Sequence, residues 1–210
     1  MTRGRFIAIE GIDGSGKSSQ IARLADWLES TGLTVTTCRD PGATPVGDAI
    51  RAILLDRRDL HLAPTAEMLL YMAARAQLVA EVVAPAVERG AWVVTDRYLL
   101  SNVVYQGHAG GLDPATIRGV GDVATGGLLP DLVVVLDVDL ETAARRLDRP
   151  LDKLENRGDG YRARVRAGYL EEARRDPAGI RVIDAAAGVD EVAARIRAAV
   201  TARFGLAVPG

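Results

Sequence analysis

The stretch Phe6-Ile-Ala-Ile-Glu10, followed by Gly11-Ile-Asp-Gly-Ser-Gly-Lys-Ser18, decides the fold of this 210-residue chain. The first five residues are mostly apolar and predict a short buried strand. The next eight match the phosphate-loop pattern G-x-x-x-x-G-K-[ST] without a mismatch. Apolar residues then recur with helical spacing at Ile21, Leu24 and Leu28. A strand, a glycine loop and a helix in this order predict a site where backbone N–H groups surround a nucleotide phosphate.

Two side chains of this loop have roles that follow from the pattern. Lys17 is placed to reach the β- and γ-phosphates, and Ser18 to bind Mg²⁺ through its hydroxyl. We therefore expect a nucleotide whose phosphates bind together with Mg²⁺. The expected nucleotide-binding residues are Gly11, Ile12, Asp13, Gly14, Ser15, Gly16, Lys17, Ser18 and Ser19.

The composition predicts a single domain over residues 1–210, because 48% of the residues are hydrophobic and the length suits one core. A net charge of −2 argues against nucleic acid as a partner. Cys38 is the single cysteine, which excludes an internal disulfide and suits the cytoplasm. The sequence contains no apolar run approaching 18 residues, so we expect no membrane span.

Strands and helices are predicted to alternate along the chain. The predicted strands are residues 6–10, 33–38, 92–95, 132–137 and 180–184. The predicted helices are residues 17–30, 46–55, 65–88, 114–123, 140–147, 161–174 and 191–203, with a kink expected near Pro85. This alternation predicts an α/β fold with a five-stranded parallel sheet and helices on both faces.

The carboxyl ends of the predicted strands are polar. Arg39-Asp40, Asp96-Arg97 and Asp137 follow three of them, at the edge where parallel sheets bind ligands. An aspartate directly after an apolar strand is typical of an outer Mg²⁺ ligand, so Asp96 is the second predicted metal residue beside Ser18. Arg97 is then suited to bind an anion at the same place.

The long helix carries Glu67, Tyr71 and Arg75 four residues apart, on one face. This pattern has two interpretations. The ring and the guanidinium could stack on and read a planar base, or the three residues could form a partly solvated stripe of ion pairs. The spacing alone does not separate them.

Several further motifs resemble one family. They are Arg39-Asp-Pro-Gly42, the stretch EMLLYMAARAQ at 67–77, and Asp96-Arg-Tyr-Leu-Leu-Ser-Asn-Val-Val-Tyr-Gln-Gly107. With the phosphate loop, they resemble thymidylate kinases over nearly the whole length. The resemblance implies a P-loop kinase fold with a short mobile lid, and a homodimer. It also implies transfer of the γ-phosphoryl group of ATP to dTMP, giving dTDP.

The resemblance implies a role for each motif residue. The implied dTMP site consists of Asp13, Arg39, Tyr71, Arg75, Arg97, Asn102, Tyr105 and Gln106. Asp13 would contact the sugar 3′-hydroxyl, and Arg39 and Arg97 the acceptor phosphate. Arg75 would donate to thymine O4, and Tyr105 would crowd the 2′ position against ribonucleotides. The shorter Asp40, in place of the usual Glu, leaves its contact with a phosphate-binding arginine open.

The family places a catalytic arginine either in the phosphate loop or in the lid. Gly14 stands where the first kind has its arginine, so the resemblance implies a lid arginine within residues 145–157. Arg149 is the predicted one, with Arg145, Arg146 and Lys153 as alternatives. Lys17, Asp96, Arg97 and Arg149 are therefore the predicted catalytic residues.

Three other functions fit parts of the sequence. A different small P-loop kinase shares the loop, but is not expected to combine the Tyr71 and Arg75 helix with Asp96-Arg97-Tyr98. A GTPase switch needs an N-K-x-D guanine motif, and neither lysine lies in one. A non-catalytic nucleotide-binding subunit would not need the full set of charged residues.

Overall fold

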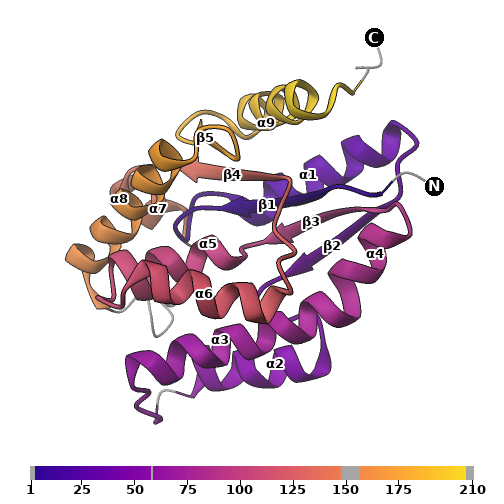
Figure 1. The fold of residues 1–210 in the computed structure, drawn as a ribbon. Helices are drawn as coiled ribbons and strands as arrows, with labels where there is room; N and C mark the ends of the chain where they lie inside the picture. The colour runs from indigo at the N-terminus through magenta and orange to yellow at the C-terminus, as the bar shows by residue number, and fades with distance from the viewer. Residues whose placement is uncertain (1–2, 58, 148–156, 207–210) are drawn as a thin grey trace.

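A computed structural model describes residues 3–57, 59–147 and 157–206 of the chain (Figure 1). Its centre is a parallel sheet of five strands in the order β2-β3-β1-β4-β5. The strands are β1 Phe6–Glu10, β2 Val35–Arg39, β3 Trp92–Asp96, β4 Leu132–Asp137 and β5 Ile180–Asp184. The predicted α/β fold is confirmed, and each predicted strand matches an observed one to within two residues at either end.

Alternate residues of β1 enter two separate cores. Phe6 and Ala8 pack in one core, and Ile7 and Ile9 in the other. All four are fully buried, which explains why the strand sequence is continuously apolar instead of alternating. The sheet is therefore covered by helices on both faces, as predicted.

The helices divide unequally between the two faces (Figure 1). One face is covered by α1 Lys17–Ser30 and α9 Val189–Phe204. The other side carries α2 Pro45–Arg51, α3 Pro64–Leu78, α4 Ala84–Glu88, α5 Leu99–Asn102, α6 Pro114–Thr125, α7 Leu140–Arg146 and α8 Asp159–Arg175. Three wider π-helical segments extend them: η1 Ala52–Asp56, η2 Val79–Val83 and η3 Val103–His108.

The predicted helix 65–88 is one continuous helical segment, α3-η2-α4. The π-helical segment η2 ends two residues before Pro85, which has no N–H to donate to the preceding turn. An 18-residue window of this segment reaches a mean hydropathy of 1.3, which passes a length and composition test for a membrane span. Half of that window is buried within the chain, including Met72 and Leu78, so the segment is a core helix.

The helix formed by α5 and η3 was not predicted. Its sequence contains the β-branched pair Val103 and Val104, which weakens the helical signal. Its start is stabilised from another element, because the Glu10 carboxylate at the end of β1 accepts from the backbone N–H of Tyr98 at 2.8 Å and of Ser101 at 3.3 Å. A cap supplied from 88 residues away in sequence leaves no local signature.

Candidate active site

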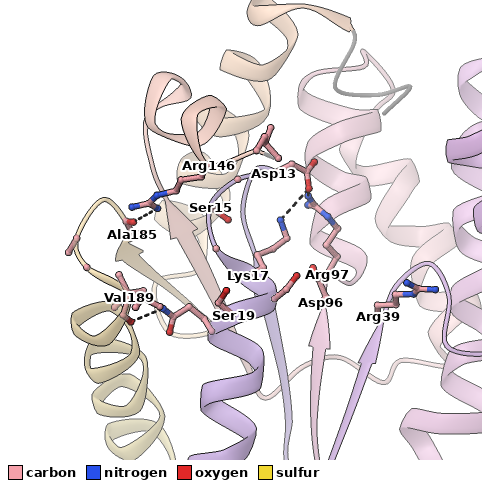
Figure 2. A pocket seen from close by; sticks show the side chains of 18 of the residues that line it. Asp13, Ser15, Lys17, Ser19, Arg39, Asp96, Arg97, Arg146, Ala185 and Val189 are labelled. Atoms are coloured by element: carbon pink, nitrogen blue, oxygen red, sulfur yellow. Dashed lines mark hydrogen bonds and ion pairs between the residues drawn. The ribbon is translucent and has the colours of Figure 1, made fainter. Parts of the chain in front are cut away.

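The phosphate loop lies at the carboxyl edge of the sheet, between β1 and α1 (Figure 2). Gly11 has a φ of 138°, and a Cβ there would lie 2.6 Å from the carbonyl oxygen of Leu136 on β4. Only glycine therefore fits between the loop and the neighbouring strand. Gly16 has a φ of 93° immediately before α1, at the helix start, where the first N–H groups have no partner within their own helix.

Lys17 is folded over its own loop. Its Nζ donates to the carbonyl oxygens of Gly11 and Ile12 at 3.1 Å each, and it lies 3.4 Å from Asp13 Oδ1. Burial lowers the pKa of its ammonium group, and the nearby Arg97 lowers it further, while Asp13 opposes both effects. A bound phosphate would replace these carbonyl partners with negatively charged oxygens.

Arg97 points from the end of β3 toward the same loop (Figure 2). Its Nη2 donates to Asp13 Oδ1 at 2.8 Å, and its Nη1 donates to the hydroxyls of Ser101 at 3.2 Å and Tyr169 at 3.1 Å. Burial by itself would lower the pKa of Arg97, but Asp13 and the neighbouring tyrosine hydroxyls raise it above its ordinary value. Its backbone φ of 67° is unusual for a non-glycine residue, which is typical of positions constrained at active sites.

Glu10, which is not among the predicted site residues, supports this arrangement. Its carboxylate accepts from Ser101 Oγ at 2.6 Å and from the Tyr169 hydroxyl at 2.8 Å, the two groups that also contact Arg97. Burial raises the pKa of the Glu10 carboxyl group. The one signal in the sequence was a carboxylate that ends an otherwise apolar strand.

Asp96 lies beside Lys17 and Arg97 at the end of β3 (Figure 2). Its Oδ1 is buried and has no hydrogen-bond partner among the described residues. Within residues 3–57, 59–147 and 157–206, no group of three His, Cys, Asp or Glu side chains could hold a metal ion unaided. Mg²⁺ in nucleotide sites takes few protein ligands and keeps water and phosphate oxygens, so Asp96 and the exposed Ser18 fit it.

Two pockets open at this edge of the sheet. The larger has a volume of about 850 Å³ and extends from the phosphate loop to the loop after β5. Its lining residues are Asp13, Gly14, Ser15, Gly16, Lys17, Ser18, Ser19, Gln20, Arg39, Asp40, Arg51, Asp96, Arg97, Arg146, Leu147, Ala185, Ala187, Gly188, Val189 and Val192. It contains most of the predicted nucleotide-binding residues.

The smaller pocket has a volume of about 90 Å³ and lies between α3, α5 and η3. Its lining residues are Asp13, Asp40, Pro41, Arg51, Leu55, Tyr71, Arg75, Arg97, Ser101, Asn102, Tyr105 and Gln106. It brings together every residue of the implied dTMP site except Arg39. The two pockets share Asp13, Asp40, Arg51 and Arg97, so ligands in them would meet at these four side chains.

The structure bears on one of the two interpretations of the α3 stripe, that of a partly solvated stripe of ion pairs. Glu67, Tyr71 and Arg75 are 3%, 8% and 1% exposed, so the partly solvated stripe is wrong. Both charged residues are nevertheless in ion pairs. Arg157 Nη2 lies 2.6 Å from Glu67 Oε2, and Arg75 Nε lies 2.6 Å from Asp40 Oδ2.

The buried pair of Arg75 and Asp40 connects α3 to the end of β2. Burial raises the pKa of the Asp40 carboxyl group, and the guanidinium of Arg75 opposes this increase. The remaining contacts of Arg75 are Met72 Sδ at 3.1 Å and the ring of Tyr98, whose centroid lies 5.2 Å from Arg75 Cζ. The arginine that pairs with Asp40 is therefore Arg75 of α3, and not one of the two arginines expected to bind the acceptor phosphate.

Arg39 does not line the smaller pocket. Its side chain is 54% exposed and pairs with Asp48 at 3.0 Å, although it lines the larger pocket. Arg51, at the end of α2, lines both pockets and donates to the carbonyl oxygen of Pro41 at 3.1 Å. Arg51 is not among the predicted site residues, because it lies outside every recognised motif in an arginine-rich chain.

Gly14 cannot carry a side chain here. It has a φ of 82°, and a Cβ would lie 2.2 Å from the carbonyl oxygen of Ala143 on α7. The candidate lid residues Arg145 and Arg146 belong to α7. Arg145 pairs with Glu141 at 2.5 Å, and Arg146 donates to the carbonyl oxygen of Ala185 at 2.7 Å.

The other two candidate lid residues, Arg149 and Lys153, lie outside the described residues. The prediction that Arg149 is the catalytic arginine therefore stays a prediction.

The geometry suits a reaction between two anions. Lys17 and Arg97 converge on the phosphate loop, and Arg51 adds a third positive charge at the junction of the two pockets. The transition state of phosphoryl transfer between two phosphates is stabilised by fixed positive charges more than by acid or base chemistry. The site is thus suited to phosphoryl transfer from one nucleotide to another.

Comparisons with known proteins agree with this chemistry. The thymidylate kinase family model matches residues 9–196. The chain is 48% identical to the thymidylate kinase of Clavibacter sepedonicus over 93% of both chains, and 44% identical to that of Deinococcus radiodurans over 97% of this chain and 99% of the relative. The crystal structure of thymidylate kinase from Ehrlichia chaffeensis matches with a TM-score of 0.78 at 27% identity, covering 95% of this chain and 99% of that one. Because the family model and these relatives span nearly its whole length, the chain belongs to the thymidylate kinase family, the ATP-dependent kinases that convert dTMP to dTDP.

Proposed function

We propose that the chain converts dTMP to dTDP with ATP in the larger pocket and dTMP in the smaller one, their phosphates meeting at the shared residues. The observation that carries this proposal is the junction of the two pockets at Asp13, Asp40, Arg51 and Arg97. It allows the γ-phosphate of ATP and the 5′-phosphate of dTMP to approach in line. Alignment of this kind supplies a large part of the rate of phosphoryl transfer.

On the donor side, the phosphate loop and Lys17 bind the ATP phosphates. Mg²⁺ would be held by the Ser18 hydroxyl and by Asp96, whose unpartnered buried oxygen supports this role. When bound, the ion neutralises charge on the β- and γ-phosphates. The adenine lies toward Arg146 and residues 185–189, where the larger pocket ends.

On the acceptor side, Arg97 and Arg51 bind the dTMP phosphate, with Arg39 at the outer edge of the pocket. Asp13 contacts the sugar 3′-hydroxyl, and Tyr105 limits the space at the 2′ position. The ring of Tyr71 stacks on thymine. Arg75 donates to thymine O4 through Nη2, the guanidinium nitrogen that has no partner among the described residues.

The chain acts as a homodimer in the cytoplasm. Leu69 on the outer side of α3 is 49% exposed and Val123 on the neighbouring α6 is 86% exposed, although both are apolar. Half of the most apolar window of α3-η2-α4 is also unburied within one chain. A second copy of the chain would cover this surface. The free thiol of Cys38 suits a reducing compartment.

A panel of nucleoside monophosphates with Mg·ATP tests the proposal. We expect dTMP and dUMP to be phosphorylated and dCMP to react poorly. Purine nucleotides should not react, because their bases are too large for the smaller pocket. Lys17→Ala should lower kcat on dTMP roughly 10³-fold or more, because a preorganised charge is lost. The control is Arg23→Ala, since Arg23 forms a solvent-exposed pair with Asp190. Near-normal turnover by Lys17→Ala with an unchanged melting temperature would contradict the assignment of the phosphate loop.

A further inference from the structure

A chain of hydrogen bonds runs from the start of α8 to the smaller pocket. Arg157 Nη2 donates to Glu67 Oε2 at 2.6 Å. Gln106 Nε2 donates to the other carboxylate oxygen, Glu67 Oε1, at 3.0 Å. Asn102 Nδ2 donates in turn to Gln106 Oε1 at 2.8 Å. Glu67, Gln106 and Asn102 are each at most 3% exposed, so water has little access to the links among them.

Glu67 determines which group donates and which accepts at each hydrogen bond in this series. A carboxylate only accepts hydrogen bonds, whereas a side-chain amide donates at one end and accepts at the other. Gln106 must therefore turn its NH₂ toward Glu67 and its oxygen toward Asn102. Asn102 must then turn its NH₂ toward Gln106, which leaves its oxygen as the free end of the chain.

The last group in this series of hydrogen bonds, the side-chain oxygen of Asn102, is an unsatisfied acceptor. Asn102 Oδ1 is buried and has no partner among the described residues, and Asn102 lines the smaller pocket. A buried acceptor without a donor is destabilising, because it has lost its hydrogen bonds to water. A ligand that brings an N–H to this oxygen removes the cost, and a ligand that brings a second acceptor does not. Thymine and uracil carry an N–H at ring position 3, whereas cytosine carries an unprotonated nitrogen there.

We propose that Glu67 is a positioning residue that selects the base by fixing the orientation of the Gln106 and Asn102 amides. Glu67 contributes through these amides, while Asn102 presents the acceptor to the base. The proposal rests on the proposed function, because it takes the base to occupy the smaller pocket. It assigns to Glu67 a role separate from that of Arg75, which reads position 4.

Glu67→Gln tests the direction of the chain with almost no change in shape. Arg157 still requires an acceptor, so Gln at position 67 turns its oxygen to Arg157 and its NH₂ to Gln106. The two following amides then reverse, and Asn102 presents NH₂ to the base. We expect kcat/KM for dTMP to fall roughly 10–100-fold, mainly through KM, while kcat/KM for dCMP stays level or rises. The preference for dTMP over dCMP should fall at least about tenfold.

Two further variants distinguish a change in the orientation of the amides from a general loss of structure or activity. Arg157→Ala keeps the Glu67 carboxylate and hence the direction, so the dTMP to dCMP preference should stay within about threefold of the wild-type value. In the double variant Glu67→Gln/Arg157→Ala, Gln at position 67 is free to turn either way. The dTMP activity lost in Glu67→Gln should therefore partly return, which a purely structural role of Glu67 would not produce.

The outcomes discriminate clearly. An unchanged preference in folded Glu67→Gln, or equal losses on dTMP and dCMP without recovery in the double variant, overturns the proposal. If Glu67→Gln does not fold, Gln106→Met replaces it. That change removes the hydrogen bond that orients the Asn102 amide, so the preference for dTMP over dCMP should again fall about tenfold. An unchanged preference would contradict the proposal. A wild-type protein that accepts dCMP as well as dTMP would overturn the proposed base site itself, together with this inference.

Discussion

Arg75 combines two tasks in one side chain. Its Nε is committed to Asp40 in a fully buried ion pair, while the same guanidinium lines the pocket proposed for thymine. Loss of one partner from such a pair leaves an uncompensated buried charge, which costs about 3–5 kcal/mol of stability. Substitutions at this position therefore affect both folding and base choice, and the two effects must be measured separately.

Arg75→Ala should lower kcat/KM for dTMP by an amount equivalent to about 2–4 kcal/mol of transition-state binding, as for a lost charged hydrogen bond. The loss for dCMP should be much smaller, because the amino group at position 4 of cytosine does not accept from Arg75. Steady-state kinetics on both substrates, well below the melting temperature of the variant, would measure this difference.

Asp40→Asn is the control for Arg75→Ala, since it weakens the same ion pair but keeps Arg75. Its dTMP to dCMP preference should remain close to the wild-type value. Equal losses on both substrates in Arg75→Ala would mean that Arg75 is only structural.

At the scale of elements, the contact between the phosphate loop and α7 explains the absence of an arginine in the loop. Gly14 lies against the backbone of Ala143, with no room for a Cβ. The last residues of α7 that the structure describes do not approach the phosphates freely, since Arg145 and Arg146 are already bound to Glu141 and to backbone carbonyls. A further arginine, if the reaction uses one, has to come from another part of the chain.

Gly14→Ala should destabilise the protein more than Gly16→Ala. Both positions have positive φ, so both variants carry backbone strain of roughly 1–3 kcal/mol. Only position 14 adds a clash, because nothing lies within 4 Å of a Cβ at Gly16. We expect a difference in unfolding free energy of about 1–3 kcal/mol, measured by denaturant titration. Equal stabilities would show that α7 does not pack tightly on the loop.

Arg149→Ala should lower kcat on dTMP with little change in the KM of either substrate. This pattern is expected for a charge that acts mainly in the transition state. The comparison series is Arg145→Ala, Arg146→Ala and Lys153→Ala, assayed under the same conditions. A larger loss of kcat in one of these three would transfer the catalytic role to that residue, and no loss in any of the four would contradict a lid arginine.

At the scale of the whole molecule, the exposed apolar side chains of α3 and α6 point to assembly. Leu69→Glu should convert the proposed dimer to a monomer in sedimentation velocity experiments, because it places a charge in the surface proposed to meet a second copy. Val182→Glu is the matched control. Val182 is also an exposed apolar residue, at 41%, but it lies on the edge strand β5 and not on α3 or α6. A wild-type monomer, or an unchanged dimer in Leu69→Glu, would contradict this interface.

The sequence by itself determined the local features of this protein. The phosphate loop, the five strands and most helices follow from glycine spacing, hydrophobic period and turn residues, which act over a few positions of the chain. The polar residues after the strands were also visible, because parallel strands place their carboxyl ends at one edge. Lys17, Asp96 and Arg97 lie together there for this reason.

Only the tertiary structure decided the features that depend on distant contacts. The start of α5 is capped by Glu10 of β1, and Arg75 of α3 pairs with Asp40 at the end of β2. Arg51 reaches both pockets although no motif contains it. Hydrogen bonds and ion pairs between polar side chains far apart in the chain leave no periodic or spacing signal. The sequence could therefore name the charged residues of the site, but only packing determined which of them are paired, which are buried, and which line the two pockets.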